Sequence, residues 1–574
     1  MKYHMNVAIG YEAIFEDYKD VNPVDLISDI PSINSLEILG YFIAQVHTKE
    51  RSFKAQVEFL RIWCGRLPNE IIPKINDFIS RVTSDGKSEF NFINNIAALI
   101  LIEIILENHN DLEKVDNLTP EQELNLFKAY LWCNQHWTDK QGSDLPKVKT
   151  ADDLISIIFP AQLPYMEILE FKDFRIQFLK AIYFFKFCEA NEVFSSYIKA
   201  FLEDYNLDSW QTYLINILSL YVRRFEELRT PSILNIQDEH ESIKDFINQY
   251  CLDVQQFVKS DDFNSLRKTP VYKIDDNNFL FLNLNFFVDK LFQGVQFEMF
   301  RVIRKNKLEY NGKQIKGFDQ FRSIYAEQIS EAGIFYESIR YSFEKCGYKL
   351  LNGKQLKEVL KDGEPDFYIR DKGKIYLFEY KDVILNAEVK HSYDFETIKS
   401  EISKKMVSNQ TGTQKGVTQL FNSISKIKNG EYKGVDDYDN LENCMIYPII
   451  VYTDFSFNLP GVNYYLNKEF NKLIDDSDLS QKHKIKDLTI IDLDTFLKFQ
   501  DLFRDKKLKI NNCLNDFRSK TKNKSNLFSM IETFNIFIHN KTFNMDYDTP
   551  KIFMDEIASM IPKDEESTVG NTRS

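Results

Sequence analysis

The stretch PDFYIRDKGKIYLFEYK, residues 365–381, decides the fold of the second half of this 574-residue chain. Two runs rich in Tyr, Phe and Ile flank the short polar segment 371–374, a pattern typical of a β-hairpin. Gly373 is expected to supply the positive φ of the turn. A two-residue and a four-residue loop both keep the same register, which places Asp366 opposite Glu379.

Side chains alternate between the faces of a strand, so Glu379 and Lys381 are expected on one face and the Tyr380 side chain on the other. Two carboxylates set opposite each other, Asp366 and Glu379, destabilise a sheet and raise the pKa of one acid unless a cation lies between them. Phosphodiester hydrolysis requires a divalent cation, acidic ligands and a group that orients water. The hairpin therefore indicates a metal-dependent hydrolase; the alternative is a surface hairpin with a solvated Glu–Lys pair.

The residues around the hairpin predict alternating helices and strands. A helical stretch over 318–346 is expected to end at Gly347, which can adopt the left-handed conformation. The other expected elements are strands at 366–370 and 374–382, helices near 391–407 and 415–427, a strand at 445–452, a helix near 463–474, a strand at 488–491 and a last helix capped by Asp494. This order predicts an α+β fold in which helices cover a mixed central sheet.

Residues 1 to about 230 are expected to be helical, because apolar residues recur there every three or four positions. Thr119-Pro120-Glu121-Gln122 has the N-cap, the first-position proline and the glutamine of a capping box. Amphipathic helices are expected at 124–137 and 174–187. Sensing, partner binding, substrate positioning and plain scaffolding all stay open as roles for this large region.

The pattern changes near residue 268. Two apolar runs, 271–274 and 279–282, predict a second hairpin with a four-residue loop, followed by a helix over 286–305. That helix has a basic tail, formed by Arg301, Arg304, Lys305 and Lys307. The predicted parts are a helical region 1–267, a connector 268–317, a sheet-containing domain 318–525 and a C-terminal helical segment 526–574 whose last residues, from 562, are polar and expected to be disordered.

The net charge of −14 is unevenly distributed along the chain. Residues 1–300 carry −16, whereas residues 301–430, which contain the hairpin, carry +7. A polyanion would be attracted to the second region and repelled by the first. The distribution favours a nucleic-acid partner for the hairpin region; ordinary fluctuation in charge is the alternative.

The composition argues against several other classes of protein. The seven cysteines are scattered and form no C-x-x-C pair, unlike those of a zinc ribbon or a disulfide framework. The longest apolar run, 96–106, is interrupted by Glu103 and is shorter than the roughly 20 residues of a membrane span. Because the N-terminus also lacks the apolar core of a signal peptide, we expect a cytoplasmic protein with no membrane partner.

Asp366 and the run Glu379-Tyr380-Lys381 resemble the signature of the PD-(D/E)XK, or restriction-endonuclease-like, nuclease superfamily. The upstream stretch 333–348, GIFYESIRYSFEKCGY, is similar in spacing to the first core helix of that superfamily. The run KGVTQL at 415–420 resembles a helix that carries a glutamine in related nucleases. The resemblance covers roughly residues 318–500 and implies an α/β/α nuclease domain with a mixed central sheet.

The resemblance implies that Asp366 and Glu379 ligate Mg²⁺ or Mn²⁺ and that the Tyr380 carbonyl completes the metal site. It implies that Lys381 orients or deprotonates the attacking water and offsets developing charge.

Two helical residues have implied roles that leave alternatives open. Glu337 is expected to bind the metal directly or through water; the alternative is a solvated helix acid. Gln419 is expected to contact phosphate or substrate; the alternative is a surface glutamine.

The expected function is a metal-dependent endonuclease acting on DNA, similar to nucleases of bacterial anti-phage defence or restriction systems. A ribonuclease or structure-specific nuclease would use the same residues, and a catalytically silent binding module acting through the helical half is a further alternative. The sequence has no G-x-x-x-x-G-K-[ST] motif, so nucleotide hydrolysis would need a partner protein. A homodimer is another expected assembly.

Overall fold

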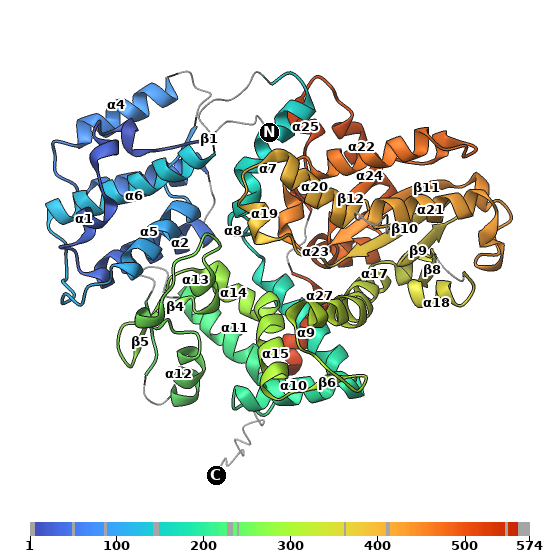
Figure 1. Ribbon diagram of the computed structural model, residues 1–574, viewed down its shortest axis with the longest axis horizontal. Helices are drawn as coiled ribbons and strands as arrows, with labels where there is room; N and C mark the ends of the chain where they lie inside the picture. The colour runs from blue at the N-terminus through green and yellow to red at the C-terminus, as the bar shows by residue number, and fades with distance from the viewer. Residues whose placement is uncertain are drawn as a thin grey trace, which may run out of the picture.

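The computed structural model describes residues 6–48, 52–84, 89–141, 148–226, 233–237, 240–360, 363–408, 412, 414–545 and 549–560. The chain is mixed α and β, with a five-stranded mixed sheet in its C-terminal half, as expected. Figure 1 shows the first helices on one side, the large sheet with its helices on the other, and the middle of the chain between and below them. The tail expected to be disordered, from residue 562, lies outside the described residues.

The N-terminal part is helical, as expected, with one short parallel strand pair that the sequence did not indicate. The Thr119 hydroxyl accepts from the Gln122 amide, and the Gln122 side chain accepts from the Thr119 amide, so the predicted capping box is confirmed. The elements are β1 (Asn6–Ala8), α1 (Pro23–Ile27), α2 (Ser32–Thr48), α3 (Phe53–Cys64), α4 (Ile72–Thr83), β2 (Glu89–Asn91), α5 (Asn95–Glu107) and α6 (Pro120–Lys140).

The middle of the chain adds helices and a small antiparallel sheet of order β3-β5-β4. The second predicted hairpin is confirmed as β4 and β5, and β3 joins it as a third strand. The single helix predicted over 286–305 is wrong, because a 3-10 turn at Asp289–Leu291 divides it. The elements are α7 (Ala151–Gln162), α8 (Met166–Leu169), α9 (Phe174–Glu189), α10 (Glu192–Asp204), α11 (Trp210–Glu226), β3 (Ile233–Asn235), α12 (Glu241–Asn248), α13 (Asn264–Lys268), β4 (Val271–Lys273), β5 (Asn278–Phe281), α14 (Leu284–Val288) and α15 (Gln293–Lys305).

The large sheet has the order β12-β11-β10-β9-β8. Strands β8, β9 and β10 form an antiparallel meander, and β11 and β12 then run parallel to β10. The strands are β8 (Lys349–Asn352), β9 (Phe367–Asp371), β10 (Lys374–Lys381), β11 (Met445–Tyr452) and β12 (Thr489–Asp492). The helices of this half are α16 (Phe318–Ile324), a π-helix η7 (Tyr325–Phe335), α17 (Tyr336–Phe343), α18 (Gly353–Lys357), α19 (Ala387–Lys390), α20 (Phe395–Met406), α21 (Gly416–Lys428), α22 (Val462–Asp475), α23 (Leu493–Arg504), α24 (Ile510–Thr521), α25 (Leu527–Met530), α26 (Phe534–Thr542) and α27 (Lys551–Met560).

The β9–β10 hairpin has the predicted register, with Asp371 opposite Lys374 and Phe367 opposite Phe378. Its loop is the two-residue one, Lys372-Gly373. The conformation predicted for the turn is wrong, because Lys372 takes the positive φ, 52°, and Gly373 does not.

Alternation along β10 divides the strand between two hydrophobic cores. Ile375 and Leu377 belong to the core beneath α7, α20, α21 and α22, whereas Tyr376, Phe378 and Tyr380 belong to the core beneath α9, η7, α17 and α23. Helices therefore cover both faces of the sheet, and by the same alternation Glu379 follows Leu377 on the α20–α21 face.

The hydrophobic cores cross the boundaries predicted at residues 267 and 317. One core joins side chains of α9–α12, α14 and α15 with those of η7, α17, β10 and α23, and another joins α7 with β10, α20 and α21. The predicted parts are thus not separate folding cores, because apolar faces far apart in sequence are buried against each other.

Two further predictions concern the N-cap of α23 and a membrane-spanning helix. Asp492, rather than Asp494, is the N-cap of α23, since its carboxylate accepts from the Thr495 amide at 2.8 Å. In the part of the chain that the structure describes, no single helix is long and apolar enough to cross a membrane; the pair Ala151–Leu169 and Phe174–Glu189 meets that measure only together, across a 75° bend.

Candidate active site

A cavity of about 1130 Å³ opens at the carboxyl end of β10. Residues of α16 and η7 form one wall, the loop after β10 forms the floor, and α20 and α21 form the opposite wall. Five of the six site residues expected from sequence line it: Asp366, Glu379, Tyr380, Lys381 and Gln419. The sixth, Glu337, does not.

Glu379 and Lys381 form an ion pair inside this cavity, as their shared strand face predicts. The Lys381 ammonium donates to Glu379 Oε1 at 2.8 Å. The Glu379 side chain is only 1% exposed, and its second oxygen, Oε2, has no hydrogen-bond partner among the described residues. A buried carboxylate oxygen without a donor costs free energy, so this position calls for a further positive group.

Asp366 lies one step beyond the last β9–β10 pair, rather than in the ladder opposite Glu379. Its Oδ2 accepts from the Tyr380 amide at 2.6 Å, and its carbonyl accepts from the Gly353 amide at 2.8 Å. These two bonds hold the Asp366 carboxylate beside the end of β10.

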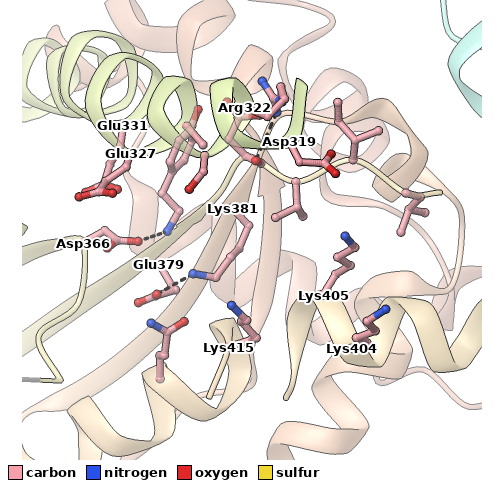
Figure 2. A pocket seen from close by; sticks show the side chains of 18 of the residues that line it. Asp319, Arg322, Glu327, Glu331, Asp366, Glu379, Lys381, Lys404, Lys405 and Lys415 are labelled. Carbon is pink, nitrogen blue, oxygen red and sulfur yellow. Dashed lines mark hydrogen bonds and ion pairs between the residues drawn. The ribbon is translucent and has the colours of Figure 1, made fainter. Parts of the chain in front are cut away.

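The π-helix η7 brings a third acid, the half-buried Glu331, to the cavity. The Tyr336 hydroxyl donates to its carboxylate. Glu327, one turn earlier and exposed, also lines this wall (Figure 2). Neither acid was predicted from sequence; the signal that could have found them is their place on the helical stretch that precedes the hairpin.

Glu337, the acid expected from the helix, lies outside the cavity. Its carboxylate pairs with Arg340 on the same helix, and its side chain is 39% exposed. Six residues separate it from Glu331, which turns the two side chains toward different sides of a helix. The expected placement of Glu337 is therefore corrected in favour of Glu331.

The pKa values of the three acids reflect their burial and their mutual repulsion. Burial and the nearby Asp366 raise the pKa of Glu379 to about 8 and that of Glu331 to about 7. Burial also raises the pKa of Asp366, against the opposing effects of Lys381 and the Tyr380 amide. The sequence predicted a raised pKa from opposed charges; in the structure burial is the larger cause.

Lys381 behaves as a protonated donor in this arrangement. Burial alone would lower its pKa, but Glu379 and Asp366 outweigh burial and raise it. The side chain can therefore hold an oxygen through hydrogen bonds, which suits an orienting role better than that of a base.

Close helix approaches at two glycines set the walls of the cavity. A Cβ on Gly333 in η7 would lie 2.6 Å from Cγ of Phe187 in α9, so the bare backbone permits this contact. A Cβ on Gly416, at the start of α21, would meet Ile450 at 3.0 Å and the Lys381 stem at 3.4 Å. A side chain at Gly333 would displace the Phe187 ring, and one at Gly416 would shift its neighbours, Ile450 and the Lys381 stem among them, by a few tenths of an ångström.

Two expected site residues contribute differently from the expectation. The Tyr380 hydroxyl lies 2.6 Å from Ser330 Oγ and its ring stacks on Phe335, so the side chain is directed to the opposite face and only its backbone adjoins the site. Gln419 lines the cavity, and its amide oxygen is buried without a partner among the described residues. That geometry is compatible with a ligand donor near Gln419.

Basic side chains line the side of the cavity opposite the acids. Figure 2 shows Glu327, Glu331, Asp366 and Glu379 on one side, with Lys404 and Lys405 on the other. Lys415 lies at the start of α21, below Lys381. The sequence indicated a basic region but not these particular lysines.

Arg322 completes the upper part of the cavity and is held by Asp382, the residue after Lys381. The guanidinium donates to the Asp382 carboxylate at 2.7 Å, and the Thr453 hydroxyl donates to the same oxygen at 2.7 Å. Burial alone would raise the pKa of Asp382. The Arg322 guanidinium and the hydrogen bonds to the carboxylate outweigh burial and keep this pKa below its usual value. This pair fixes the loop that follows β10 to α16.

The donor set fits a small divalent cation. Within the described ranges, no group of three or more His, Cys, Asp or Glu side chains is arranged to enclose a metal ion. Mg²⁺ takes one or two carboxylates and keeps waters and phosphate oxygens as its other ligands. Asp366 and the Glu379 carboxylate, with its unpartnered oxygen, match that requirement.

Comparisons with protein-family models, with curated proteins and with solved structures each gave no match.

Proposed function

We propose that this protein is a metal-dependent nuclease that hydrolyses phosphodiester bonds, in DNA first of all. The observation that carries the proposal is the meeting of Asp366, Glu379 and Lys381 in one cavity whose acids are unbalanced and whose far wall is basic. Structural ion pairs are usually balanced, whereas raised carboxylate pKa values in a cavity are typical of a functional site.

Each residue has a role that follows from its position. Asp366 and Glu379 would hold Mg²⁺ or Mn²⁺, which when bound activates water and neutralises charge on the phosphate. Lys381 would donate to the attacking water or to a phosphate oxygen beside Glu379. Glu331 would orient water on the η7 side, while Gln419 and Lys415 would contact the substrate from α21.

The wider setting of the proposal rests on the resemblance to restriction-endonuclease-like nucleases and not on the geometry. On that basis we place the activity in a bacterial anti-phage defence or restriction system of the cytoplasm, with a partner protein or a second copy of the chain as helper. Duplex DNA, single strands and RNA would all present the same phosphodiester to the cavity.

The test is a cleavage assay of the full chain on plasmid, linear duplex, single-stranded DNA and RNA, with Mg²⁺, Mn²⁺ or EDTA. Cutting is expected with either metal, and is expected to disappear in EDTA and in Lys381→Ala. Lys372→Asn is the matched control, since it removes an exposed lysine at the other end of the same hairpin and asparagine tolerates the φ of 52° there. Metal-independent cutting, or no cutting of any substrate with either metal, would refute the proposal.

A further inference from the structure

An aromatic platform extends the cavity wall outward on the side of α15 and α16. The rings of Phe297 and Phe318 stack nearly parallel, with centroids 4.7 Å apart and an interplanar angle of 12°. Phe318 lines the cavity, and Phe297 is 48% exposed although it is a large apolar side chain. Phe297 belongs to none of the three hydrophobic cores formed by the described residues.

The basic tail of α15 lies next to this platform. Arg301 and Lys305 are both engaged by Asp204. Arg304 instead lies over the Phe300 ring, with 5.9 Å between its guanidinium carbon and the ring centroid, and forms no ion pair within the part of the chain that the structure describes. Since Phe300 in turn contacts Phe318, the exposed cation continues the aromatic surface.

The opposite wall carries cations without aromatic rings. Lys404 and Lys405 share one acid, Glu401, at 3.4 Å and 3.7 Å, so the wall keeps a net positive charge. Lys415 forms no ion pair with any described residue, and Figure 2 shows it below Lys381, with Lys404 and Lys405 to its right. Phosphates can therefore be neutralised along α20 and α21, while the exposed ring of Phe297 is available on α15.

We propose that the substrate bound here is an unpaired, single-stranded polynucleotide, an inference that rests on the proposed nuclease function. A base stacks on the exposed Phe297 ring, which Phe318 supports from behind, and the phosphates follow Lys404, Lys405 and Lys415 past Asp366. A cationic groove combined with aromatic rings is the arrangement by which single strands are held without sequence preference. In a duplex the base faces are covered by their neighbours, so that an aromatic platform beside the groove would have no partner.

The test measures binding separately from cleavage. Full-length protein carrying Lys381→Ala is titrated, by fluorescence anisotropy with Mg²⁺, into a labelled 20-nucleotide oligo(dT), an oligo(U) of the same length and a 20-base-pair duplex. Single strands are expected to bind at least about tenfold more tightly than the duplex. Phe297→Ala is expected to weaken single-strand binding by about 5- to 100-fold, the effect of losing one stacked base.

Two further variants keep this result interpretable. Phe297→Trp keeps a stacking surface and should retain single-strand binding, whereas Phe543→Ala removes an 80% exposed ring outside the cavity and should leave it unchanged. Removing Lys404, Lys405 or Lys415 should each reduce the slope of log affinity against log salt by about 0.7. The oligo(dT) and oligo(U) arms decide between DNA and RNA.

The outcomes separate this inference from the proposed function. Equal or tighter binding of the duplex, or single-strand binding that is unchanged in Phe297→Ala, would overturn the single-strand proposal even if metal-dependent cleavage is found. Phe297-dependent binding of single strands without cleavage by the wild-type protein would support the platform while refuting the nuclease.

Discussion

Two clusters of buried charge in this molecule are built from the same kinds of residue and have opposite electrostatics. In the candidate active-site cluster, Asp366, Glu379 and Glu331 surround Lys381, and the pKa values of the acids are raised. In the Glu167 network, one acid on α8 lies between Arg267 of α13 and Lys390 of α19, and the pKa of Glu167 is held well below its usual range.

The Glu167 network is closely connected. Arg267 donates to Glu167 Oε2 at 2.7 Å, Lys390 to Oε1 at 3.2 Å and the Ser456 hydroxyl to Oε1 at 3.1 Å. Burial alone would raise the pKa of Glu167, but the two cations outweigh it. The network thereby joins the helical half to the segment that follows β10.

We interpret the difference as one between a structural and a proposed functional use of buried charge. Around Glu167 the nearby cations lower the pKa of the acid, and the ion pairs connect α8, α13 and α19. Where acids exceed cations, as around Glu379, the fold bears a free-energy cost that a bound cation would relieve. The four predictions below test that contrast, from the largest effect to the smallest.

Loss of Lys381 should have the largest effect, because it removes the cation beside Glu379. Lys381→Ala is expected to reduce cleavage by about 10²- to 10⁴-fold, the usual contribution of a positioned acid–base or orienting group. Single-turnover cleavage with Mg²⁺ measures this. A variant within threefold of the wild type would show that the active-site cluster is not catalytic.

Breaking the balanced cluster should mainly affect stability. Glu167→Gln removes the carboxylate that Arg267 and Lys390 share and leaves Lys390 with the more distant Asp262, at 3.9 Å, so the free energy of unfolding should fall by about 3–5 kcal/mol. Denaturation in urea, followed by circular dichroism, checks this against Glu388→Gln, an exposed acid on the same helix as Lys390. Equal stability of the two variants would contradict a structural role for the network.

Removing an acid from the unbalanced cluster should instead raise the free energy of unfolding. The unfolded Glu379 ionises near its ordinary value of 4.5 but the folded one near pH 8, so the folded state binds more protons between these values and loses stability as pH rises. Glu379→Gln should therefore raise the free energy of unfolding by about 1–3 kcal/mol at pH 8 in EDTA.

Added Mg²⁺ should reverse the order of Glu379→Gln and the wild type, because metal binding stabilises only a protein that retains its ligands. Glu327→Gln, at an exposed position on the same cavity, is the matched control. A Glu379→Gln protein less stable than the wild type in EDTA would mean that the Lys381 ion pair outweighs the repulsion.

Glu103, a buried acid outside both clusters, tests how burial by itself changes stability with pH. Glu103 in α5 accepts from the Ser260 amide at 3.3 Å, and burial raises its pKa to about 8. Between pH 4.5 and 8 its folded form holds the extra proton, so Glu103→Gln should gain about 1–2 kcal/mol of stability at pH 8 and nothing near pH 5. Thermal midpoints at the two pH values, beside the exposed Glu107→Gln, measure this; a gain that is independent of pH would refute it.

Local patterns accounted for much of the fold. The limits of β11 at 445 and 452, the register of the β9–β10 hairpin and the capping box at Thr119 all follow from neighbouring residues, and all are confirmed. Period, turn chemistry and caps act within a few residues of each other, so a single sequence displays them.

The helical acid of the site could not be predicted in the same way. Glu337 and Glu331 lie on one continuous helical stretch, and which of them faces the cavity depends on the π-helical turn at Tyr325–Phe335 and on the contact between Gly333 and Phe187 of α9. Such a contact joins segments far apart in sequence, and no local pattern encodes it.

The sequence by itself determined the strand pair, the shared face of Glu379 and Lys381, and the chemistry that an acid and an ammonium at this spacing can support. Only the tertiary structure decided that Glu331 rather than Glu337 joins them, and that lysines of α20 and α21 lie opposite. It also decided that Glu379 is buried deeply enough for its pKa to rise to about 8. The physical reason is the sequence distance over which each property is set. Adjacent residues determine backbone geometry, whereas burial and local charge depend on segments far apart in sequence that the fold brings together.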